Sequence, residues 1–133
     1  MCIELLEFPK IEDPRGNISV IEELIQAPFK IERVYWIYDV PGGQTRGGHA
    51  FKKQKEIIVA LSGSFEVVTH DGQNQKIFHL NRSYYGLYLP NGIWRQMKNF
   101  STNALALVLS STPFDKNDYV YDYDSFLKLK NKT

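Results

Sequence analysis

The sequence predicts an all-β domain, an antiparallel sandwich or jelly roll, that ends in one short helix. Segments rich in β-branched and aromatic residues recur at short intervals along the chain. These segments are residues 33–39, 56–61, 64–70, 74–80, 85–89 and 104–110. Turn-forming residues separate them at Pro41-Gly42-Gly43, Gly47-Gly48, Asp71-Gly72 and Pro90-Asn91-Gly92. Short strands at this spacing are typical of sandwiches and jelly rolls.

Local signals indicate the remaining elements. Asp13-Pro14-Arg15-Gly16 is a turn sequence, so residues 3–8 before it are expected to form an N-terminal strand. Asp71-Gly72 lies between two strand segments and predicts a tight hairpin. Asp122 is a suitable N-cap for a last helix. That helix is expected to contain Phe126, Leu127 and Leu129, with Lys128, Lys130 and Lys132 toward its C-terminal end.

Length and composition indicate a single domain that covers residues 1–133. Apolar residues make up 43% of the chain and charged residues 23%, as in ordinary globular proteins. Lys and Arg number 16 against 15 Asp and Glu, and a net charge of +1 does not favour an extended nucleic-acid surface. The apolar runs are too short to span a membrane, the N-terminus does not resemble a signal peptide, and Cys2 has no partner for an internal disulfide. We therefore expect a cytoplasmic protein without nucleic-acid or membrane partners.

Two motifs in the middle of the chain refine the fold class. Gly43, His49, Glu56 and Gly63 match the pattern G-x5-H-x-H-x3,4-E-x6-G. Further along, Pro90, Gly92 and Asn99 match P-x-G-x2-H-x3-N. Together these spacings resemble the two motifs of the cupins. The resemblance implies a small cupin β-barrel of the jelly-roll type, with a short C-terminal helix added.

The departures from the cupin motifs concern the metal ligands. Metal cupins use two His and a Glu from the first motif and a His from the second. Here Phe51 and Arg95 stand at two of those His positions, which leaves only His49 and Glu56. Phenylalanine has no lone pair to offer, and arginine is a permanent cation that repels a divalent metal. Because catalytic metals usually need at least three protein ligands, we expect no metal.

Further matches extend the resemblance to residues 13–126. They are Asp13-Pro14-Arg15-Gly16, Arg33-Val34-Tyr35, Arg46-Gly47-Gly48-His49-Ala50, Asp118-Tyr119 and Asp122-Tyr123-Asp124-Ser125-Phe126. With them the chain resembles the WxcM-like nucleotide-sugar 3,4-ketoisomerases, which are metal-free cupins. The family's typical motif is R-G-x-H-A-H, and Phe51 replaces its second His in this chain.

The family resemblance implies an activity and an assembly. Family members act on dTDP-4-keto-6-deoxy-D-glucose and move the ketone from C4 to C3. Their products feed aminotransferases that make 3-amino-3,6-dideoxyhexoses for S-layer, lipopolysaccharide or antibiotic sugars. They form homodimers that exchange N-terminal strands. The partners expected for this chain are therefore a dTDP-linked 4-keto-6-deoxyhexose and a second copy of itself.

The chemistry of such a shift points to candidate catalytic residues. The reaction removes the proton on C3, passes through an enediol and returns a proton to C4. The substrate is its own donor and acceptor, so we expect no cofactor. His49 suits the base, because an unperturbed imidazole is largely neutral at pH 7. Tyr35 and Arg95 are the other catalytic candidates, Arg95 as a stabiliser of the enediolate. Asn17, Tyr35 and Arg95 remain open as the second proton donor, and Arg95 can instead form a structural salt bridge with Glu56.

The candidate substrate-binding residues are Arg33, Arg46, Lys52, Asn17 and Trp94. Arg33 and Arg46 suit the diphosphate, where bidentate, permanently charged donors are favoured. Strand alternation places Arg33 and Tyr35 on one face of their strand. Trp94 can stack on thymine or wall the hexose, and equally it can be a core tryptophan. Tyr35 can simply be packed, and Lys52 can lie on a solvated face.

Three other functions compete with the ketoisomerase. They are a nucleotide-sugar 3,5-epimerase, a non-catalytic sugar-binding cupin and a metal-dependent dioxygenase. The loss of two ligand positions argues against the dioxygenase. The sequence leaves the gluco or galacto configuration of the product at C4 open.

Overall fold

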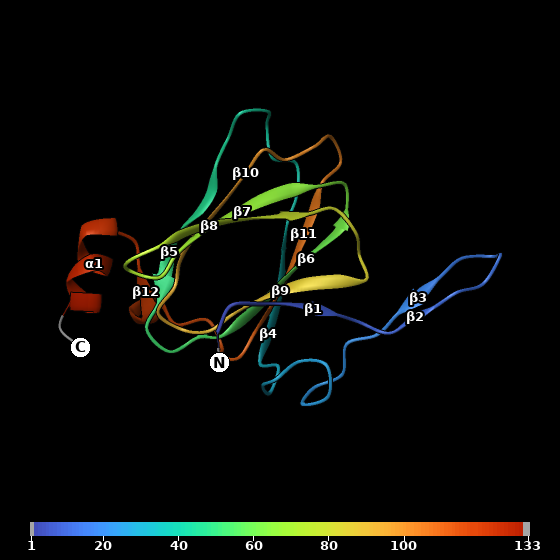
Figure 1. Cartoon of the computed structure of the whole chain (residues 1–133), viewed down its shortest axis with the longest axis horizontal. Helices are drawn as coiled ribbons and strands as arrows, with labels where there is room; N and C mark the ends of the chain where they lie inside the picture. Colours follow the sequence, from blue (N-terminus) through green and yellow to red (C-terminus); the bar gives the residue numbers. More distant parts are fainter. Residues whose placement is uncertain (1, 132–133) are drawn as a thin grey trace.

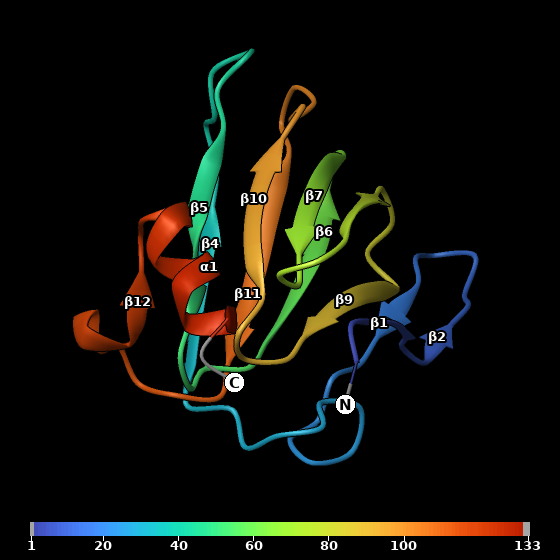
Figure 2. The same ribbon diagram turned by 60° about the vertical axis from the view of Figure 1, so that its left-hand side comes forward.

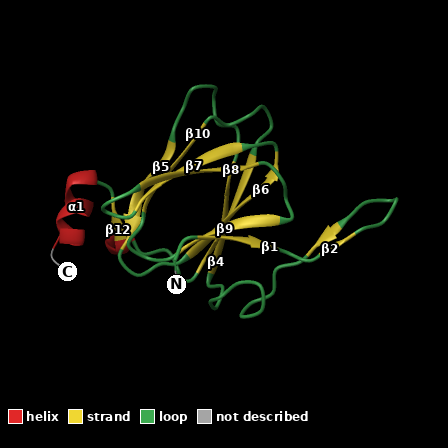
Figure 3. Cartoon of the chain, viewed as in Figure 1, coloured by secondary structure: helices red, strands yellow, loops and turns green. Residues whose placement is uncertain are grey.

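Two five-stranded antiparallel sheets face each other and form the body of the chain (Figures 1 and 3). The computed structural model describes residues 2–131. The first sheet has the order β1 (Glu4–Glu7), β9 (Tyr85–Leu89), β6 (Glu56–Ser62), β11 (Leu105–Ser110) and β4 (Arg33–Ile37). The second has the order β12 (Tyr119–Val120), β5 (Arg46–Phe51), β10 (Trp94–Lys98), β7 (Phe65–His70) and β8 (Gln75–Leu80). This arrangement confirms the predicted all-β jelly roll with a short C-terminal helix.

Strand alternation fills the space between the sheets with apolar side chains along most of its length. Ile58 and Ala60 of β6 and Val108 of β11 point inward and pack against Phe65 and Met97 of the second sheet. Toward one end of the barrel, the side chains between the sheets are polar. There Arg33, Ser110 and Glu56 lie in register on three neighbouring strands, and Arg95 pairs with His49 across the second sheet. This polar end of the barrel is where a site can form.

The expected strand segments all form, with their ends shifted by at most two residues. The hairpin at Asp71-Gly72 joins β7 to β8 as predicted. Asp71 Oδ1 accepts the N–H groups of Gln73 and Asn74, each at 2.8 Å, which holds the loop closed.

The prediction of a turn at Gly47-Gly48 is wrong, because both glycines lie inside β5. The register between β5 and β10 shifts between Arg95 and Met97, so the chain bulges at these glycines. Gly47 has φ +71°, and a Cβ there would lie 2.1 Å from Arg95 Nη1. The glycine is required by the close approach of a buried arginine as well as by its positive φ.

The N-terminal region forms β1 within the expected segment 3–8. In the structure β1 pairs with β9 of the same chain, with Glu4 opposite Tyr88. Asp13-Pro14-Arg15-Gly16 makes the expected turn, in the loop between β2 (Lys10–Ile11) and β3 (Ile18–Ser19). This small hairpin projects away from the barrel (Figures 1 and 2). Exchange of the N-terminal strand with a second copy stays a prediction.

The predicted C-terminal helix is present as α1 (Tyr123–Asn131), which follows the short 3-10 turn η1 (Lys116–Asp118) and β12. Asp122 Oδ2 accepts the Ser125 N–H at 3.1 Å, so Asp122 caps the first turn. Phe126 of α1 is buried and packs against Ala50 and Val120 on the outer face of the second sheet. Lys128 and Lys130 lie in the last turn, and Lys132 falls outside the described residues. In the described part of the chain, no helix has the length and apolar character needed to cross a membrane.

Candidate active site

A cavity of about 440 Å³ opens at the polar end of the barrel, between β4 and the β5–β10 pair. Its lining is aromatic and cationic, with glycine backbone from the β5 bulge. The lining residues are Tyr35, Trp36, Ile37, Arg46, Gly47, Gly48, His49, Arg95, Tyr119 and Tyr121. The cavity therefore collects side chains from β4, β5, β10 and the segment at β12, which are far apart in the sequence.

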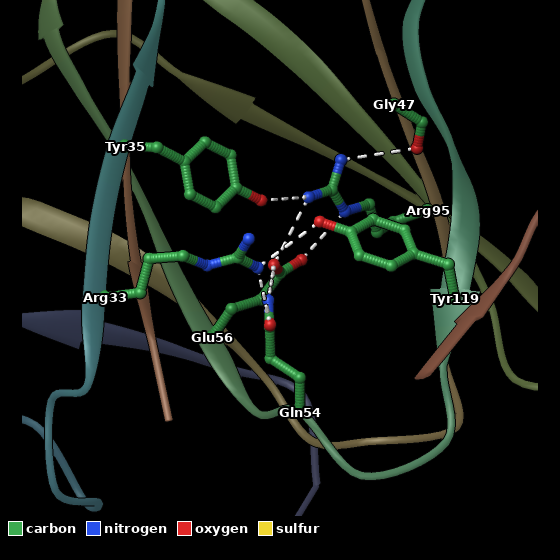
Figure 4. Close-up of polar contacts among 7 residues, drawn as sticks. All are labelled: Arg33, Tyr35, Gly47, Gln54, Glu56, Arg95 and Tyr119. Carbon is green, nitrogen blue, oxygen red and sulfur yellow. Dashed lines mark hydrogen bonds and ion pairs between the residues drawn. The ribbon is translucent and has the colours of Figure 1, made fainter. Parts of the chain in front are cut away.

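Arg95 forms a buried ion pair with Glu56 (Figure 4). Its Nε donates to Glu56 Oε1 at 2.7 Å, and its Nη2 donates to Glu56 Oε2 at 3.2 Å. Both side chains are buried, with 1% and 2% of their surfaces exposed. Nη2 also donates to the Tyr35 hydroxyl at 3.1 Å, and Nη1 donates to the Gly47 carbonyl at 3.2 Å. Four of the five guanidinium N–H groups are thus engaged, so Arg95 has a structural role as well as a place in the cavity wall.

A second arginine is joined to this pair through Gln54 (Figure 4). Arg33 Nη2 donates to Gln54 Oε1 at 2.8 Å and to the Tyr119 hydroxyl at 3.3 Å. Gln54 Nε2 in turn donates to Glu56 Oε2 at 3.3 Å. The result is a continuous network from Arg33 to Arg95, in which Gln54 and Glu56 fix the positions of both cations.

His49 lies beside this network with a free nitrogen. Its Nε2 is buried and has no hydrogen-bond partner among residues 2–131. Its ring centroid lies 5.0 Å from that of Tyr119 and 4.8 Å from that of Phe51. Burial, followed by the charges of Arg95 and Arg33, lowers the pKa of His49 to about 3. The imidazole is therefore neutral at pH 7 and can accept a proton.

The lowered pKa of His49 predicts that the protein loses stability in weak acid. Between the ordinary value of 6.5 and the folded value of about 3, the unfolded chain binds a proton at His49 and the folded chain does not. Stability therefore falls as the pH drops below 6.5, by about 1.4 kcal/mol per pH unit, or about 2 kcal/mol at pH 5. Urea denaturation at pH 7 and pH 5 measures this loss. In the His49→Asn variant the loss should be smaller by that amount, and equal losses in both proteins would contradict the lowered pKa.

Tyr35 is held in its protonated form. Burial, and then the carboxylate of Glu56, raise the pKa of its hydroxyl well above the ordinary value of a tyrosine. Tyr35 accepts a hydrogen bond from Arg95, and its own O–H remains available as a donor. The side chain can therefore bind a substrate oxygen but is a poor source of a phenolate.

Comparison with known proteins places this arrangement in a family. The family model FdtA, described as WxcM-like, C-terminal, matches residues 1–131. The chain belongs to this WxcM-like family. A relative from Aneurinibacillus thermoaerophilus, TDP-4-oxo-6-deoxy-alpha-D-glucose-3,4-oxoisomerase, is 39% identical over 125 residues, which is 94% of this chain and 90% of the relative.

Solved structures of 3,4-ketoisomerases have the same fold. A 3,4-ketoisomerase from Helicobacter canadensis has a TM-score of 0.95 and 40% identity, covering 98% of each chain. The sugar 3,4-ketoisomerase QdtA from Thermoanaerobacterium thermosaccharolyticum, solved in complex with TDP, has a TM-score of 0.95 and 35% identity over 98% of this chain and 95% of that one. A dTDP-4-dehydrorhamnose 3,5-epimerase from Bacillus anthracis, at 16% identity and a TM-score of 0.77, shares the fold alone.

The structure of this WxcM-like chain brings some of the predicted site residues together. His49, Tyr35, Arg95 and Arg46 all line the cavity. Arg33 lies behind that lining, with its guanidinium 4.9 Å from the centre of the Tyr35 ring and bonded to Tyr119. The predicted placement of Arg33 and Tyr35 on one face of their strand is confirmed by the alternating burial of β4. The alternative of a salt bridge between Arg95 and Glu56 is also confirmed.

Three predicted substrate-binding residues lie away from this cavity. Trp94 precedes Arg95 in β10 and therefore points to the opposite face, where it packs on Tyr123 and Phe126 of α1. Lys52 is exposed in the loop after β5, beside α1. Asn17 lies in the loop of the projecting β2–β3 hairpin, where its Oδ1 accepts the Asp13 N–H at 3.2 Å. Within one chain, these residues do not take part in the site that contains His49.

The residues that the sequence analysis missed are Tyr119, Tyr121 and Gln54. Asp118-Tyr119 is one of the matches to the family, which was the available signal for Tyr119. Gln54 lies between the two motif positions His49 and Glu56, and no pattern distinguishes it from its lysine neighbours. Among residues 2–131, no three His, Cys, Asp or Glu side chains gather closely enough to hold a metal ion. Glu56, the remaining motif carboxylate, is bonded to Arg95 through both oxygens.

Proposed function

We propose that this protein is a dTDP-4-keto-6-deoxy-D-glucose 3,4-ketoisomerase that works by acid–base catalysis without a cofactor. The observation that carries the proposal is the neutral, buried imidazole of His49, whose Nε2 is unpartnered in the described chain, beside a cavity with arginine and tyrosine donors. Family membership supports the same activity, since the relatives described above at 35–40% identity are 3,4-oxoisomerases or 3,4-ketoisomerases. The substrate supplies both the donor and the acceptor carbon, so no redox cofactor is needed.

The geometry suits the first chemical step. His49 accepts the C3 proton, and the C3–H electron pair forms a C3=C4 double bond while the C4 carbonyl becomes an enediolate. The cavity offers one remaining Arg95 N–H and the Tyr35 O–H to the oxygens that carry negative charge. The imidazolium then returns a proton to C4, the proton of the C3 hydroxyl passes to the C4 oxygen, and the ketone forms at C3. Arg46 is exposed at the mouth, where its permanent charge suits the diphosphate.

The proposal extends to the setting of the enzyme. We place it in the cytoplasm as a homodimer that exchanges N-terminal strands. Its 3-keto product would supply an aminotransferase that makes a 3-amino-3,6-dideoxyhexose for a glycan such as lipopolysaccharide. The projecting β2–β3 hairpin, whose Ile11 and Ile18 are exposed, supports contact with a second copy.

Proton NMR of dTDP-4-keto-6-deoxyglucose with the enzyme in D2O tests this function. We expect a 3-keto species with deuterium at C4, and the coupling at C4 gives its gluco or galacto configuration. Deuterium at C5 with the ketone still at C4 would instead indicate a 3,5-epimerase. Absence of any exchange would contradict catalysis on this substrate and favour a sugar-binding protein.

A further inference from the structure

Tyr119 is a second proton-transfer candidate that lies close to His49. It is the first residue of β12 and pairs with Phe51 of β5, so its ring covers the position at which the family motif has a second His. The Tyr119 ring lies 4.5 Å from the Phe51 ring and 5.0 Å from the His49 ring, measured between centroids. Its side chain lines the same cavity as His49. Tyr119 therefore presents a hydroxyl to the cavity next to the proposed base.

The Tyr119 hydroxyl has one hydrogen-bond partner in the described chain, and that partner is a cation. It accepts an N–H from Arg33 Nη2 at 3.3 Å (Figure 4), which leaves its own proton free to be donated. A guanidinium at this distance stabilises a phenolate oxygen if the proton leaves. Arg33 is itself fixed by Gln54 Oε1 at 2.8 Å, so the cation is held in place before the substrate binds.

The backbone around Tyr119 is also fixed. Asp118, which precedes it, is buried, and its two carboxylate oxygens accept the N–H groups of Lys53 at 2.7 Å and Gln54 at 3.0 Å. This clamp ties the β12 segment to the loop that carries Gln54. The segment that carries Tyr119 is therefore fixed to Gln54, the residue that binds Arg33, and the position of the Tyr119 hydroxyl does not depend on a mobile loop.

Tyr35, the other tyrosine hydroxyl in the cavity, is less suited to lose its proton. It lies next to the Glu56 carboxylate through their shared partner Arg95, and burial with that negative charge raises its pKa. Tyr119 also accepts a hydrogen bond from an arginine, Arg33, but its ring lies against the rings of His49 and Phe51. Its position next to the proposed base therefore favours Tyr119 as the second proton-transfer group.

We propose that Tyr119 moves the proton between the two oxygens of the enediol while His49 moves the proton between the two carbons. This inference rests on the proposed ketoisomerase function and deepens it. It supplies the second acid–base group for which the sequence left Asn17, Tyr35 and Arg95 open.

The protons and electrons balance in both halves of this scheme. His49 takes the C3 proton, the C3–H pair becomes the C3=C4 bond, and the C4 carbonyl oxygen takes the Tyr119 proton. The Tyr119 phenolate, paired with Arg33, then takes the proton of the C3 hydroxyl, and the C3 carbonyl forms. The electrons of the double bond take the His49 proton at C4. Both residues end in their starting protonation states.

Comparing two rates in one experiment tests the inference. The full-length Tyr119→Phe variant is incubated with dTDP-4-keto-6-deoxyglucose in D2O, and NMR follows deuterium entry at C3 of the remaining 4-keto sugar together with 3-keto product formation. We expect product formation to fall by ~10²-fold or more, because no group then removes the proton of the C3 hydroxyl. Exchange at C3 should stay within ~10-fold of the wild-type rate, because His49 is intact and the donors of Arg95 and Tyr35 can still stabilise the enediolate. Tyr123→Phe, which removes a hydroxyl from α1 on the other face of the second sheet, serves as the matched control and should change neither rate.

The outcomes separate this inference from the proposed function. Suppose that the wild-type chain forms the 3-keto product. If both rates then fall equally in Tyr119→Phe, or if neither falls, the role of Tyr119 is overturned and the proposed function stands. The same split of rates in Tyr35→Phe but not in Tyr119→Phe overturns it as well and assigns the proton to Tyr35. A wild-type chain that forms no 3-keto product overturns the proposed function and this inference with it.

Discussion

Replacing Glu56 by leucine should lower the free energy of unfolding by about 3–5 kcal/mol, because it leaves the Arg95 cation buried without a counter-charge. Arg95 is 1% exposed, and Glu56 accepts two of its N–H groups. Gln54 Nε2 would lose its acceptor on Glu56 at the same time. Urea denaturation followed by circular dichroism measures the change.

The double variant Glu56→Leu with Arg95→Met is the control for this prediction. Removing both charges eliminates the unpaired cation, and replacing a buried pair by apolar residues of similar size is often neutral or stabilising. We therefore expect the double variant to regain most of the stability that the single variant loses. A double variant as unstable as Glu56→Leu alone would show that the loss comes from packing and not from the buried charge.

The His49→Asn variant should lose about 10²–10⁴-fold in turnover, since a positioned general base contributes that much and asparagine cannot accept the C3 proton. Affinity for dTDP should be almost unchanged, because the imidazole is neutral in the folded protein and its removal changes no charge in the cavity. Turnover by NMR and dTDP affinity by calorimetry are the two measurements.

His79→Asn is the matched control, because His79 is exposed on β8 and lies outside the cavity. It should leave both turnover and dTDP affinity at the wild-type level. Near-normal turnover in His49→Asn would show that another group is the base. A large loss of dTDP affinity would instead place His49 in nucleotide binding.

Strand alternation made part of the site predictable. The order of side chains in β4 puts Arg33 and Tyr35 on the inner face, and the structure has them there. The same rule, applied to β10, puts Trp94 and Arg95 on opposite faces. Since Arg95 occupies a motif position of the barrel interior, Trp94 had to face α1. Trp94 was chosen as a substrate-binding candidate by residue type, and within one chain the structure has it packed on α1, which agrees with the alternative of a packed tryptophan.

Gly47 shows a limit of local reasoning. A glycine pair is typical of a turn, and the sequence around it gives no sign that it lies within a strand. Position 47 requires glycine because of a side chain 48 residues away: Arg95 Nη1 donates to the Gly47 carbonyl and occupies the space that a Cβ would fill. Contacts between distant residues of this kind carry no local signature.

The strand segments, the hairpin at Asp71, the capped helix and the family can all be predicted from the sequence alone, because periodicity, turn chemistry and motif spacing are properties of neighbouring residues. The sequence also offered an ion pair with Glu56 as one of two roles for Arg95, and the structure contains that pair. The folded chain is needed to see that Gln54 and Tyr119 complete the network and that Asn17, Lys52 and Trp94 lie outside the cavity. These positions depend on how the two sheets pack and on which strand ends lie next to each other. Both are set by interactions between residues that are far apart in the chain.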